Sequence, residues 1–449
     1  MPAVLRVKPE EIATAEKRQA YTVSVVGCRQ IGVLYAIAFT EAGYKVVCTD
    51  LDQSLVRNIA KGKAPYVARE AEIKLKRFAK TGQLNATGDL KSAVLQSDII
   101  LISTPVKFDD KKRADYSDIE KICKQIGAAL RRDTLVIYTG ITGFGATEGI
   151  IKELLENTSG FKVGDSFGFV YNPMYIPNSQ RLATIRDQEL KIAAADKTSL
   201  DSATKILGTI TEKPIRRIPD IKIAEAAALF SIAKKDAHTA LANELAIFCE
   251  NTGIDYIETL KILDAQYTDI APTIAEENCR DGAYLLLESA ENLTAKLRLP
   301  TLARQINEQM TGHAVNLAQD ALRSCGKTLR RARIALLGNV QPQTAAETLL
   351  QMLEKKGAKL NLYDPASSVN EQVSMARVLK KSLNETVEGT DCIIIISPLD
   401  MLTRLNLKKL YGAMKAPAAF VDLTGMVEPQ KVEKEGFIYR GIGRGVGNR

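Results

Sequence analysis

Apolar and polar positions along the first 50 residues follow a pattern that predicts a strand, a helix and a second strand. An apolar run at residues 22–26 meets Gly27, and a helix-like stretch follows at 32–41. After Gly43, a second apolar run at 44–49 ends at Asp50. Short apolar runs bounded by glycine indicate strands, and the stretch between them has the length of a helix. We therefore predict a βαβ unit here.

The next part of the chain repeats this alternation. Apolar runs that predict strands lie at residues 98–103, 135–138 and 167–171, and helix-like stretches lie between them at 117–130 and 147–156. Strands that alternate with helices are typical of a doubly wound parallel sheet. The pattern therefore predicts a Rossmann-like α/β domain, at residues 21–218, after an N-terminal extension at 1–20.

The pattern changes after Pro219. Residues 223–250 form a long run rich in Ala and Leu without Gly or Pro, and helix-like stretches follow at 283–296 and 300–322. An apolar-rich run of this length without a helix breaker predicts a long helix. We therefore expect a central all-helical domain at residues 219–325.

A second βαβ pattern opens the last part of the chain. It places strands at residues 333–337 and 359–363 around a helix at 344–356, with Gly338 after the first strand and Asp364 after the second. Further strands are predicted at 392–397 and 419–423. The predicted fold class is thus α/β, with a second Rossmann-like domain at 326–449 joined to the first by the helical domain.

Composition narrows the class of protein. The 449 residues are 45% hydrophobic and 25% charged, with a net charge of +8, which is the profile of a globular protein and gives no reason to expect nucleic acid as a partner. No run approaches the ~18 apolar residues of a membrane span, so we expect no membrane insertion. The seven cysteines are scattered and never form a C-x-x-C pair, which favours reduced thiols in the cytoplasm.

Histidine is scarce. The chain has only His238 and His313, which are too few ligands for a histidine metal site and leave few candidates for a Ser-His or Cys-His catalytic pair. We expect no metal site, and any chemistry has to use Cys, Lys, Asp or Glu.

A set of short motifs in a fixed order carries a family resemblance. They are Ser103-Thr-Pro105, Asp115-Tyr-Ser-Asp118, Tyr171-Asn-Pro173, Ala224-Glu225, Ala242-Asn-Glu-Leu245, Gly253-Ile-Asp255, Tyr363-Asp-Pro365 and Tyr439-Arg-Gly-Ile-Gly-Arg444. Their order and spacing resemble the NAD-dependent nucleotide-sugar 6-dehydrogenases, which act on UDP-glucose, GDP-mannose or UDP-N-acetylmannosamine in glycan biosynthesis. The resemblance implies a cofactor domain, a helical domain that forms a homodimer, and a nucleotide-sugar domain.

The resemblance also assigns a cofactor site. The fingerprint G-x-G-x-x-G reads Gly27-Cys-Arg29-Gln-Ile-Gly32, with Arg29 in place of the middle glycine. That glycine normally lets the backbone approach the pyrophosphate, so Arg29 either crowds a dinucleotide or pairs with its phosphates. Asp50 is placed to accept from a ribose hydroxyl and favours NAD over NADP. The expected cofactor-binding residues are Gly27, Arg29, Gln30, Ile31, Gly32, Asp50, Thr104 and Pro105. A Rossmann scaffold that no longer holds a cofactor is the alternative.

Several catalytic positions of the family carry residues that cannot do its chemistry. The family lysine and asparagine of the long helix fall on Ala228 and Ile232, its glutamate falls on Met174, and its Glu-Ser-Thr turn reads Thr139-Gly-Ile141. Loss of a single oxyanion donor costs an enzyme roughly 100- to 1000-fold in rate. Activity by the usual mechanism is therefore doubtful.

The remaining catalytic candidates are Cys279 and Asp281. Members of the family trap an aldehyde on a cysteine thiolate, and Cys279 is the nearest match, although its Glu276-Glu-Asn lead differs from theirs. Two acidic neighbours would raise the pKa of the thiol and Arg280 would lower it. An ordinary loop cysteine is the alternative.

The substrate implied by the resemblance is a UDP- or GDP-linked sugar, with Asn243 and Arg444 as candidate contacts. The loop after residue 337 lacks the family's basic residues. Three interpretations remain open: an active dehydrogenase with a remodelled site, a non-catalytic paralogue that binds or regulates, and a different redox enzyme on the same frame.

Overall fold

The structure is a computed structural model of the chain, and it describes residues 4–109, 111–174, 183–187, 189–263, 271–274, 277–340, 344–364, 377–397 and 405–445. Its contacts divide the chain into two compact units. The first contains residues 1–233 and 281–296, and the second contains 234–280 and 297–449. The three-domain division at 219 and 325 stays a prediction, because the long helix α10 (Ile221–Thr252) contributes to both units.

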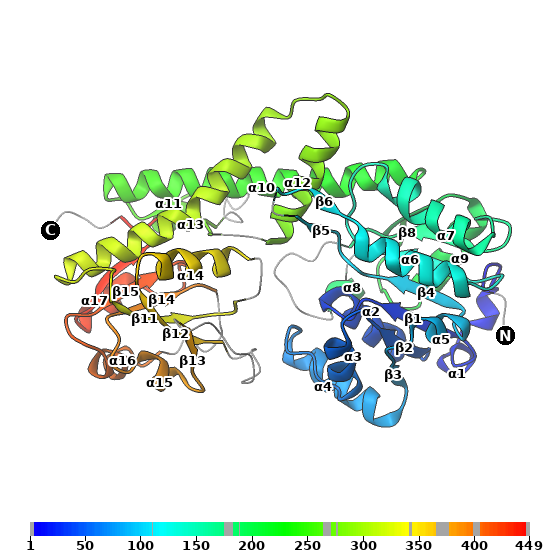
Figure 1. The fold of residues 1–449 in the computed structure, drawn as a ribbon, viewed down its shortest axis with the longest axis horizontal. Helices are drawn as coiled ribbons and strands as arrows, with labels where there is room; N and C mark the ends of the chain where they lie inside the picture. Colours follow the sequence, from blue (N-terminus) through cyan, green and yellow to red (C-terminus); the bar gives the residue numbers. More distant parts are fainter. Residues whose placement is uncertain are drawn as a thin grey trace. The chain divides into compact units, whose positions relative to one another are not determined.

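A mixed sheet forms the centre of the first unit (Figure 1). Among the described residues its strand order is β10-β9-β8-β7-β4-β1-β2-β3. The strands are β1 (Thr22–Val26), β2 (Lys45–Thr49), β3 (Leu84–Ala86), β4 (Ile99–Ile102), β7 (Leu135–Tyr138), β8 (Gly168–Tyr171), β9 (Lys191–Ala194) and β10 (Arg216–Arg217). From β3 to β8 the order and the parallel pairing are those of dinucleotide-binding Rossmann folds. Strand β9 pairs antiparallel with β8, which the prediction of a purely parallel sheet did not include.

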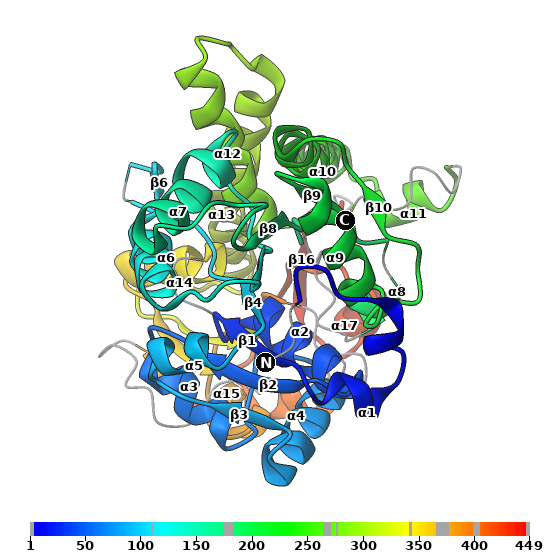
Figure 2. The ribbon, with the colours of Figure 1, turned by 90° about the vertical axis from the view of Figure 1, so that its right-hand side faces the viewer.

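Helices cover both faces of this sheet. Figure 2 shows α6 and α7 on one side of β4 and β8, and α9 on the other. The α9 side holds a continuous core to which α2, α4 and α9 contribute Leu34, Leu75 and Ile206, packed with Val25 and Leu101. The helices and turns of this unit before α10 are η1 (Pro9–Glu11), α1 (Ala15–Arg18), α2 (Gln30–Glu41), α3 (Gln53–Ala60), α4 (Arg69–Thr81), α5 (Leu90–Leu95), α6 (Ser117–Ala129), η2 (Thr147–Lys152), α7 (Glu153–Ser159), α8 (Ala183–Asp187) and α9 (Lys197–Leu207). Two short strands, β5 (Lys107–Phe108) and β6 (Ala114–Asp115), form a separate hairpin.

The second unit contains a parallel sheet with the same strand order. Among the described residues the order is β13-β12-β11-β14-β15-β16, and every pair is parallel. The strands are β11 (Arg333–Leu337), β12 (Lys359–Tyr363), β13 (Arg377–Leu379), β14 (Cys392–Ile395), β15 (Ala419–Asp422) and β16 (Ile438–Gly441). Numbered from its own first strand, this order is also 3-2-1-4-5-6, so the prediction of two Rossmann-like folds is confirmed.

Alternate residues of β11 face two separate cores. Ile334 and Leu336 pack in one cluster with α13 and α14, whereas Ala335 and Leu337 pack in another with α15, α16 and α17. Figure 1 shows α13 and α14 on one side of this sheet and α15 and α16 on the other. The remaining helices are α11 (Tyr256–Leu260), α12 (Glu277–Asn292), α13 (Arg298–Ser324), α14 (Ala345–Lys355), α15 (Leu383–Val387), α16 (Leu407–Ala413) and α17 (Pro429–Lys434).

Helices α10 and α13 agree with the predicted stretches at 223–250 and 300–322, whereas α11 was not predicted and α12 differs from the stretch at 283–296. Helix α12 begins at Glu277, six residues before the predicted start at 283, so Cys279 lies in a helix and not in a loop. The helix continues through Gly282 because that glycine packs against Ile232. A Cβ at position 282 would lie 2.5 Å from Ile232 Cδ1. Tertiary packing thus overrides the weak helix preference of glycine.

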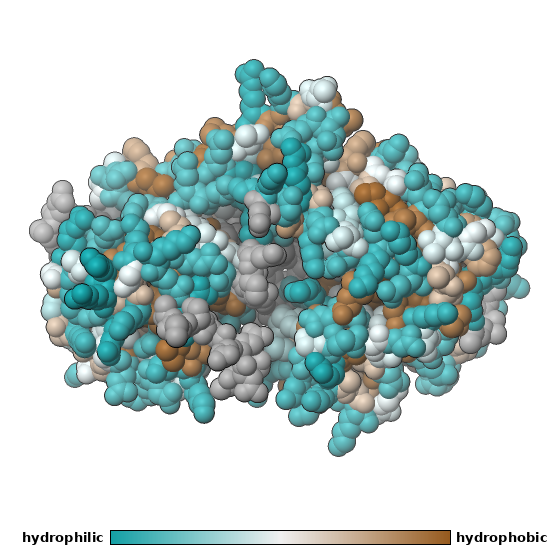
Figure 3. All heavy atoms as spheres, viewed as in Figure 1, coloured by the Kyte–Doolittle hydropathy of each residue, from teal (hydrophilic) through white to brown (hydrophobic). Residues whose placement is uncertain are grey.

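Hydrophilic side chains cover most of the face seen in Figure 3, and the apolar side chains there lie in small patches. Within the described ranges, no helix combines the length and the apolar character that crossing a bilayer requires.

Candidate functional site

The glycine turn after β1 has the geometry that a dinucleotide site requires. Gly27 has φ +104°, and its N–H donates to the Thr49 carbonyl at 2.9 Å. A Cβ at Gly32 would lie 1.8 Å from the Gly27 carbonyl oxygen, so any side chain there would collide with the backbone. Gly27 therefore makes the turn and Gly32 allows the close approach of α2, which are the roles expected of the first and third glycines.

Arg29 occupies the middle position of the fingerprint without strain. Its backbone is extended, with φ −82° and ψ −172°, and its exposed side chain does not cap α2. The pKa of Asp52 is lowered, first by a hydrogen bond with Ser54 and in smaller part by the charge of Arg29. Gln30 and Ile31 follow in the first turn of α2 and are half-buried.

Asp50 joins the turn to a cavity at the end of β2. Its carboxylate accepts from the backbone N–H groups of Cys28 at 2.6 Å and Asp52 at 2.9 Å. The adjoining cavity has a volume of about 200 Å³, and its lining includes Asp50, Leu51, Gln53, Leu90, Ile122 and Gln125. Mixed apolar and hydrogen-bonding walls beside a carboxylate fit the base and ribose of a nucleoside, and the negative charge disfavours a 2′-phosphate.

Two side chains that the sequence did not identify hold the turn in place. The Ser103 hydroxyl donates to the Gly27 carbonyl at 2.8 Å, and the Tyr66 hydroxyl donates to the Cys28 carbonyl. Ser103 was visible in the Ser-Thr-Pro motif, whereas Tyr66 lies 38 residues from Cys28 and gave no local signal. Both bonds fix the loop before any ligand binds.

Thr104 and Pro105 lie beside this turn, at the carboxyl end of β4. A Cβ at Gly27 would lie 3.0 Å from the Thr104 N atom, and the Thr104 carbonyl accepts from the Tyr138 hydroxyl at 3.3 Å. The structure therefore brings these two predicted residues together with Gly27 and Gly32.

Cys28, between the fingerprint glycines, is an inert thiol. Its side chain is buried, and a hydrogen bond with Cys48 together with burial raises the pKa of the thiol well above the ordinary value. Thiolates are the reactive form of cysteine, so this residue has a packing role.

Apolar side chains fill the positions where the resemblance expects catalytic polar groups. Ile232 is buried against Gly282, Met174 is buried in the core of the first unit, and Ala228 is half-buried. The buried carboxylate nearby belongs to Glu225, which accepts from the N–H groups of Gly145 at 2.6 Å and Thr147 at 2.8 Å. Glu225 thus stabilises the start of η2.

The remaining predicted residues are placed as follows. Cys279 lies in the first turn of α12, but its side chain lies outside the described residues, and Asp281 is half-buried on the same helix.

Asn243 is wholly buried in the second unit. Arg444 is also buried there, and it donates to the Asp255 carboxylate at 2.7 Å and to the Gly425 carbonyl at 3.2 Å. The catalytic and substrate roles of these residues stay predictions.

The second unit repeats the turn geometry of the first. Gly338 has φ +146°, and a Cβ there would lie 2.6 Å from Ser397 Oγ. The Val340 N–H donates to the Asp364 carboxylate at 3.3 Å. Thr344 caps the next helix, α14, by accepting from the Glu347 N–H at 3.1 Å.

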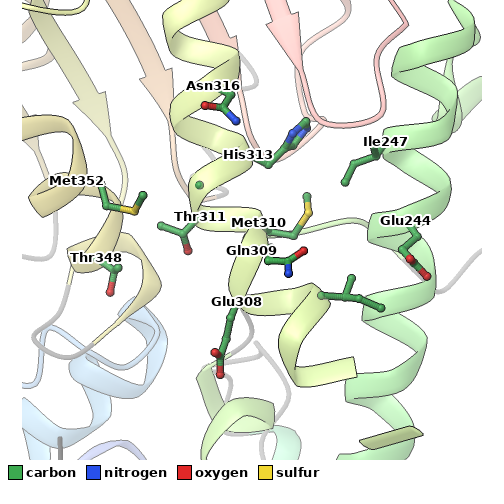
Figure 4. A pocket seen from close by; sticks show the side chains of 12 residues that line it. Glu244, Ile247, Glu308, Gln309, Met310, Thr311, His313, Asn316, Thr348 and Met352 are labelled. Carbon is green, nitrogen blue, oxygen red and sulfur yellow. The ribbon is translucent and has the colours of Figure 1, made fainter. Parts of the chain in front are cut away.

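A larger hollow of about 550 Å³ lies beside α13 (Figure 4). Glu244 and Ile247 of α10 lie on one side of α13, and Thr348 and Met352 of α14 lie on the other. Glu244 and Glu308 give the hollow two carboxylates, which disfavour a phosphate group.

Comparison with known proteins gives the cofactor and the ligand class. Residues 21–209 match the NAD binding domain of the UDP-glucose/GDP-mannose dehydrogenase family, and residues 343–429 match its UDP binding domain. The cofactor of this domain is NAD, and the glycine turn with Asp50 fits it.

Similar proteins extend over nearly the whole chain. A UDP-N-acetyl-D-mannosamine dehydrogenase of Pyrococcus horikoshii is 26% identical, over 94% of this chain and 99% of its own. A UDP-glucose 6-dehydrogenase of Rhizobium meliloti is 22% identical over 94% and 99%. The solved structure of a UDP-D-ManNAc dehydrogenase of P. horikoshii aligns with a TM-score of 0.80 at 24% identity, over 94% of this chain and 99% of that one.

Proposed function

Because the chain belongs to the UDP-glucose/GDP-mannose dehydrogenase family, we propose that it binds a nucleotide sugar and oxidises its C6 alcohol to the carboxylate. The observation that carries the proposal is the glycine turn with Asp50, which lies inside the matched NAD-binding region. Two NAD+ molecules each accept one hydride, and one water molecule supplies the second oxygen of the carboxylate, with release of three protons. Cys279 and Asp281 are the candidate catalytic residues in this proposal.

A second candidate function is favoured by the packing around α10. Ile232 and Gly282 fit together closely, and two further positions at which the resemblance expects polar catalytic groups carry Ala228 and Met174. None of these side chains exchanges a proton or stabilises an alkoxide. The second candidate is therefore a non-catalytic subunit that keeps NAD and nucleotide-sugar binding and regulates or supports an active relative.

One experiment separates the two functions. Purified protein is mixed with NAD and UDP-glucose, UDP-N-acetylmannosamine or GDP-mannose, and NADH formation is followed by absorbance. An active dehydrogenase forms two NADH per sugar, and Cys279→Ser stops the reaction. A non-catalytic subunit forms none, yet NAD and the nucleotide sugar still raise its melting temperature. The Cys279→Ser variant, tested for the same thermal shifts, shows that loss of turnover is not loss of folding.

We also propose a homodimer through α10. Five large apolar side chains of this helix are exposed, and they are Ile223 (51%), Phe230 (63%), Leu241 (52%), Leu245 (46%) and Phe248 (59%). At 3.6 residues per turn their spacing places them along one side of the helix, as expected of a contact surface. Light scattering should give twice the chain mass, and Phe248→Asp should reduce it to the single mass.

We propose in addition that the protein is located in the cytoplasm and takes part in polysaccharide biosynthesis. Both rest on the family and on the cysteine pattern of the sequence.

A further inference from the structure

A buried network of hydrogen bonds and an ion pair joins α10 to α13 inside the second unit. The Asp236 carboxylate accepts from Arg304 Nε and Nη2, both at 2.8 Å. Asn307 Nδ2 donates to the same carboxylate and to the Asp236 carbonyl, both at 2.9 Å. All three side chains are buried. A buried charge held by this many donors has one fixed orientation.

This network sets the orientation of a fourth side chain, Asn243. Since the amide nitrogen of Asn307 faces Asp236, its oxygen faces Asn243 and accepts from Asn243 Nδ2 at 2.9 Å. The Asn243 oxygen is thereby turned away from α13. It accepts from the backbone N–H of Thr273 at 2.9 Å.

Thr273 lies in a segment without regular secondary structure, residues 271–274, which therefore depends on other parts of the unit for its position. Its neighbour Ile274 is 5% exposed and packs in the core cluster with Ala242, Ala246 and Met310. Two consecutive residues are thus anchored on the same helix pair, one by a hydrogen bond and one by apolar packing. The chain then continues into α12, whose first turn carries Cys279.

We infer that Asn243 is a positioning residue, which holds the segment at 271–274 on α10 and so sets where the start of α12 lies. Both polar atoms of its amide are hydrogen-bonded inside the protein, the nitrogen to Asn307 and the oxygen to Thr273, and its side chain is wholly buried. Asn243 is therefore no contact of the nucleotide sugar. The link to catalysis, through Cys279, rests on the proposed function.

Hydrogen exchange of the full-length protein tests the inference without any need for activity. Removing the amide with Asn243→Ala should speed exchange of the Thr273 amide about tenfold, since one buried hydrogen bond is lost. Asn243→Asp keeps an oxygen toward Thr273 but sets a second oxygen against that of Asn307, so it should lower the free energy of unfolding while exchange of the Thr273 amide stays slower, relative to the rest of the second unit, than in Asn243→Ala. Asn361→Ala is the matched control, because Asn361 donates to the Thr386 carbonyl at 2.9 Å elsewhere in the same unit, and it should leave Thr273 unchanged.

The outcomes are distinct. Faster exchange at 271–274 in Asn243→Ala, with helices α10 and α13 unchanged, supports the inference. Equal acceleration throughout the second unit, or none at Thr273, overturns it. Titration of each variant with UDP adds a second readout: weaker UDP binding by Asn243→Ala with unchanged exchange at Thr273 also overturns it. If no variant and no wild-type protein forms NADH, the proposed function fails while the exchange result stands.

Discussion

The two Rossmann-like sheets of this chain share the same turn and differ in the helix that follows it. In each, a glycine with positive φ ends the first strand, and an aspartate after the second strand accepts from the turn. These residues are Gly27 and Asp50 in one sheet, and Gly338 and Asp364 in the other. A serine after the fourth consecutive strand packs on each glycine.

The helix starts are chemically opposite. Helix α2 begins after Arg29 with no side-chain cap and no acidic residue in its first turn. Helix α14 is capped by Thr344 and carries Glu347 in its first turn. Because the N-terminus of a helix attracts anions, the start of α2 is open to a phosphate group, whereas Thr344 and Glu347 already occupy the start of α14. The two sheets thus share a fold, and a few side chains at one helix end determine which ligand group can bind there.

The largest expected effect comes from the third glycine of the first turn, which has no counterpart among the described residues of the second. Gly32→Ala places a methyl group against the Gly27 carbonyl. We expect unfolding free energy to fall by about 3 kcal/mol and NAD binding to be lost. Urea denaturation with and without NAD measures both. Gly149→Ala is the control, since a Cβ there meets nothing within 4 Å, and a similar loss in it would contradict the steric explanation.

The two aspartates should separate the two ligands. Asp50→Ala removes a charged acceptor, and we expect NAD affinity to fall about 10- to 100-fold while UDP affinity is unchanged. Asp364→Ala should lower UDP affinity about 10- to 100-fold and leave NAD affinity unchanged. Calorimetry of both variants with both ligands gives the answer. If one variant weakens both ligands equally, the sheets do not bind separate nucleotides.

Removing the cap of α14 should affect stability alone. Thr344→Val keeps the shape of the side chain and deletes the hydroxyl that accepts from the Glu347 N–H. We expect a loss of about 1 kcal/mol in unfolding free energy and no change in UDP affinity. A change in UDP affinity would show that this helix start contacts the ligand after all.

The smallest expected effect concerns Arg29. Arg29→Ala should weaken NAD binding about fivefold at low salt, through loss of a charge beside the pyrophosphate, and less at high salt. Arg216→Ala removes the same charge from β10, at the far edge of the sheet, and should have no effect. Tighter NAD binding by Arg29→Ala would mean that this side chain obstructs the turn.

The fold was predictable wherever strands are buried on both faces. Strands β1, β7 and β11 were predicted with the bounds that the structure shows, because each reads as a short, mostly apolar run before a turn. Helix α4 was not predicted, since it has many charges and buries only Ala71, Leu75 and Phe78. The early start of α12 was missed because the contact of Gly282 with Ile232 joins residues 50 positions apart.

The candidate site divides in the same way. Gly27, Gly32 and Asp50 were predictable because their roles depend on the local turn and its two strands. Tyr66 was not, because it reaches the turn from a distant part of the chain. The internal partners of Asn243 were also unpredictable, since they come from α13 and from the segment before α12.

The division of the chain into units also bears on its synthesis. Residues 281–296 belong to the first unit, although the 47 residues before them, 234–280, belong to the second. A nascent chain ending at residue 233 therefore lacks the stretch with Gly282 that covers Ile232. Domains fold as units while the ribosome extends the chain, so the first unit gains its last contacts only after residue 296 has emerged. No single cut in the gene therefore separates the two units.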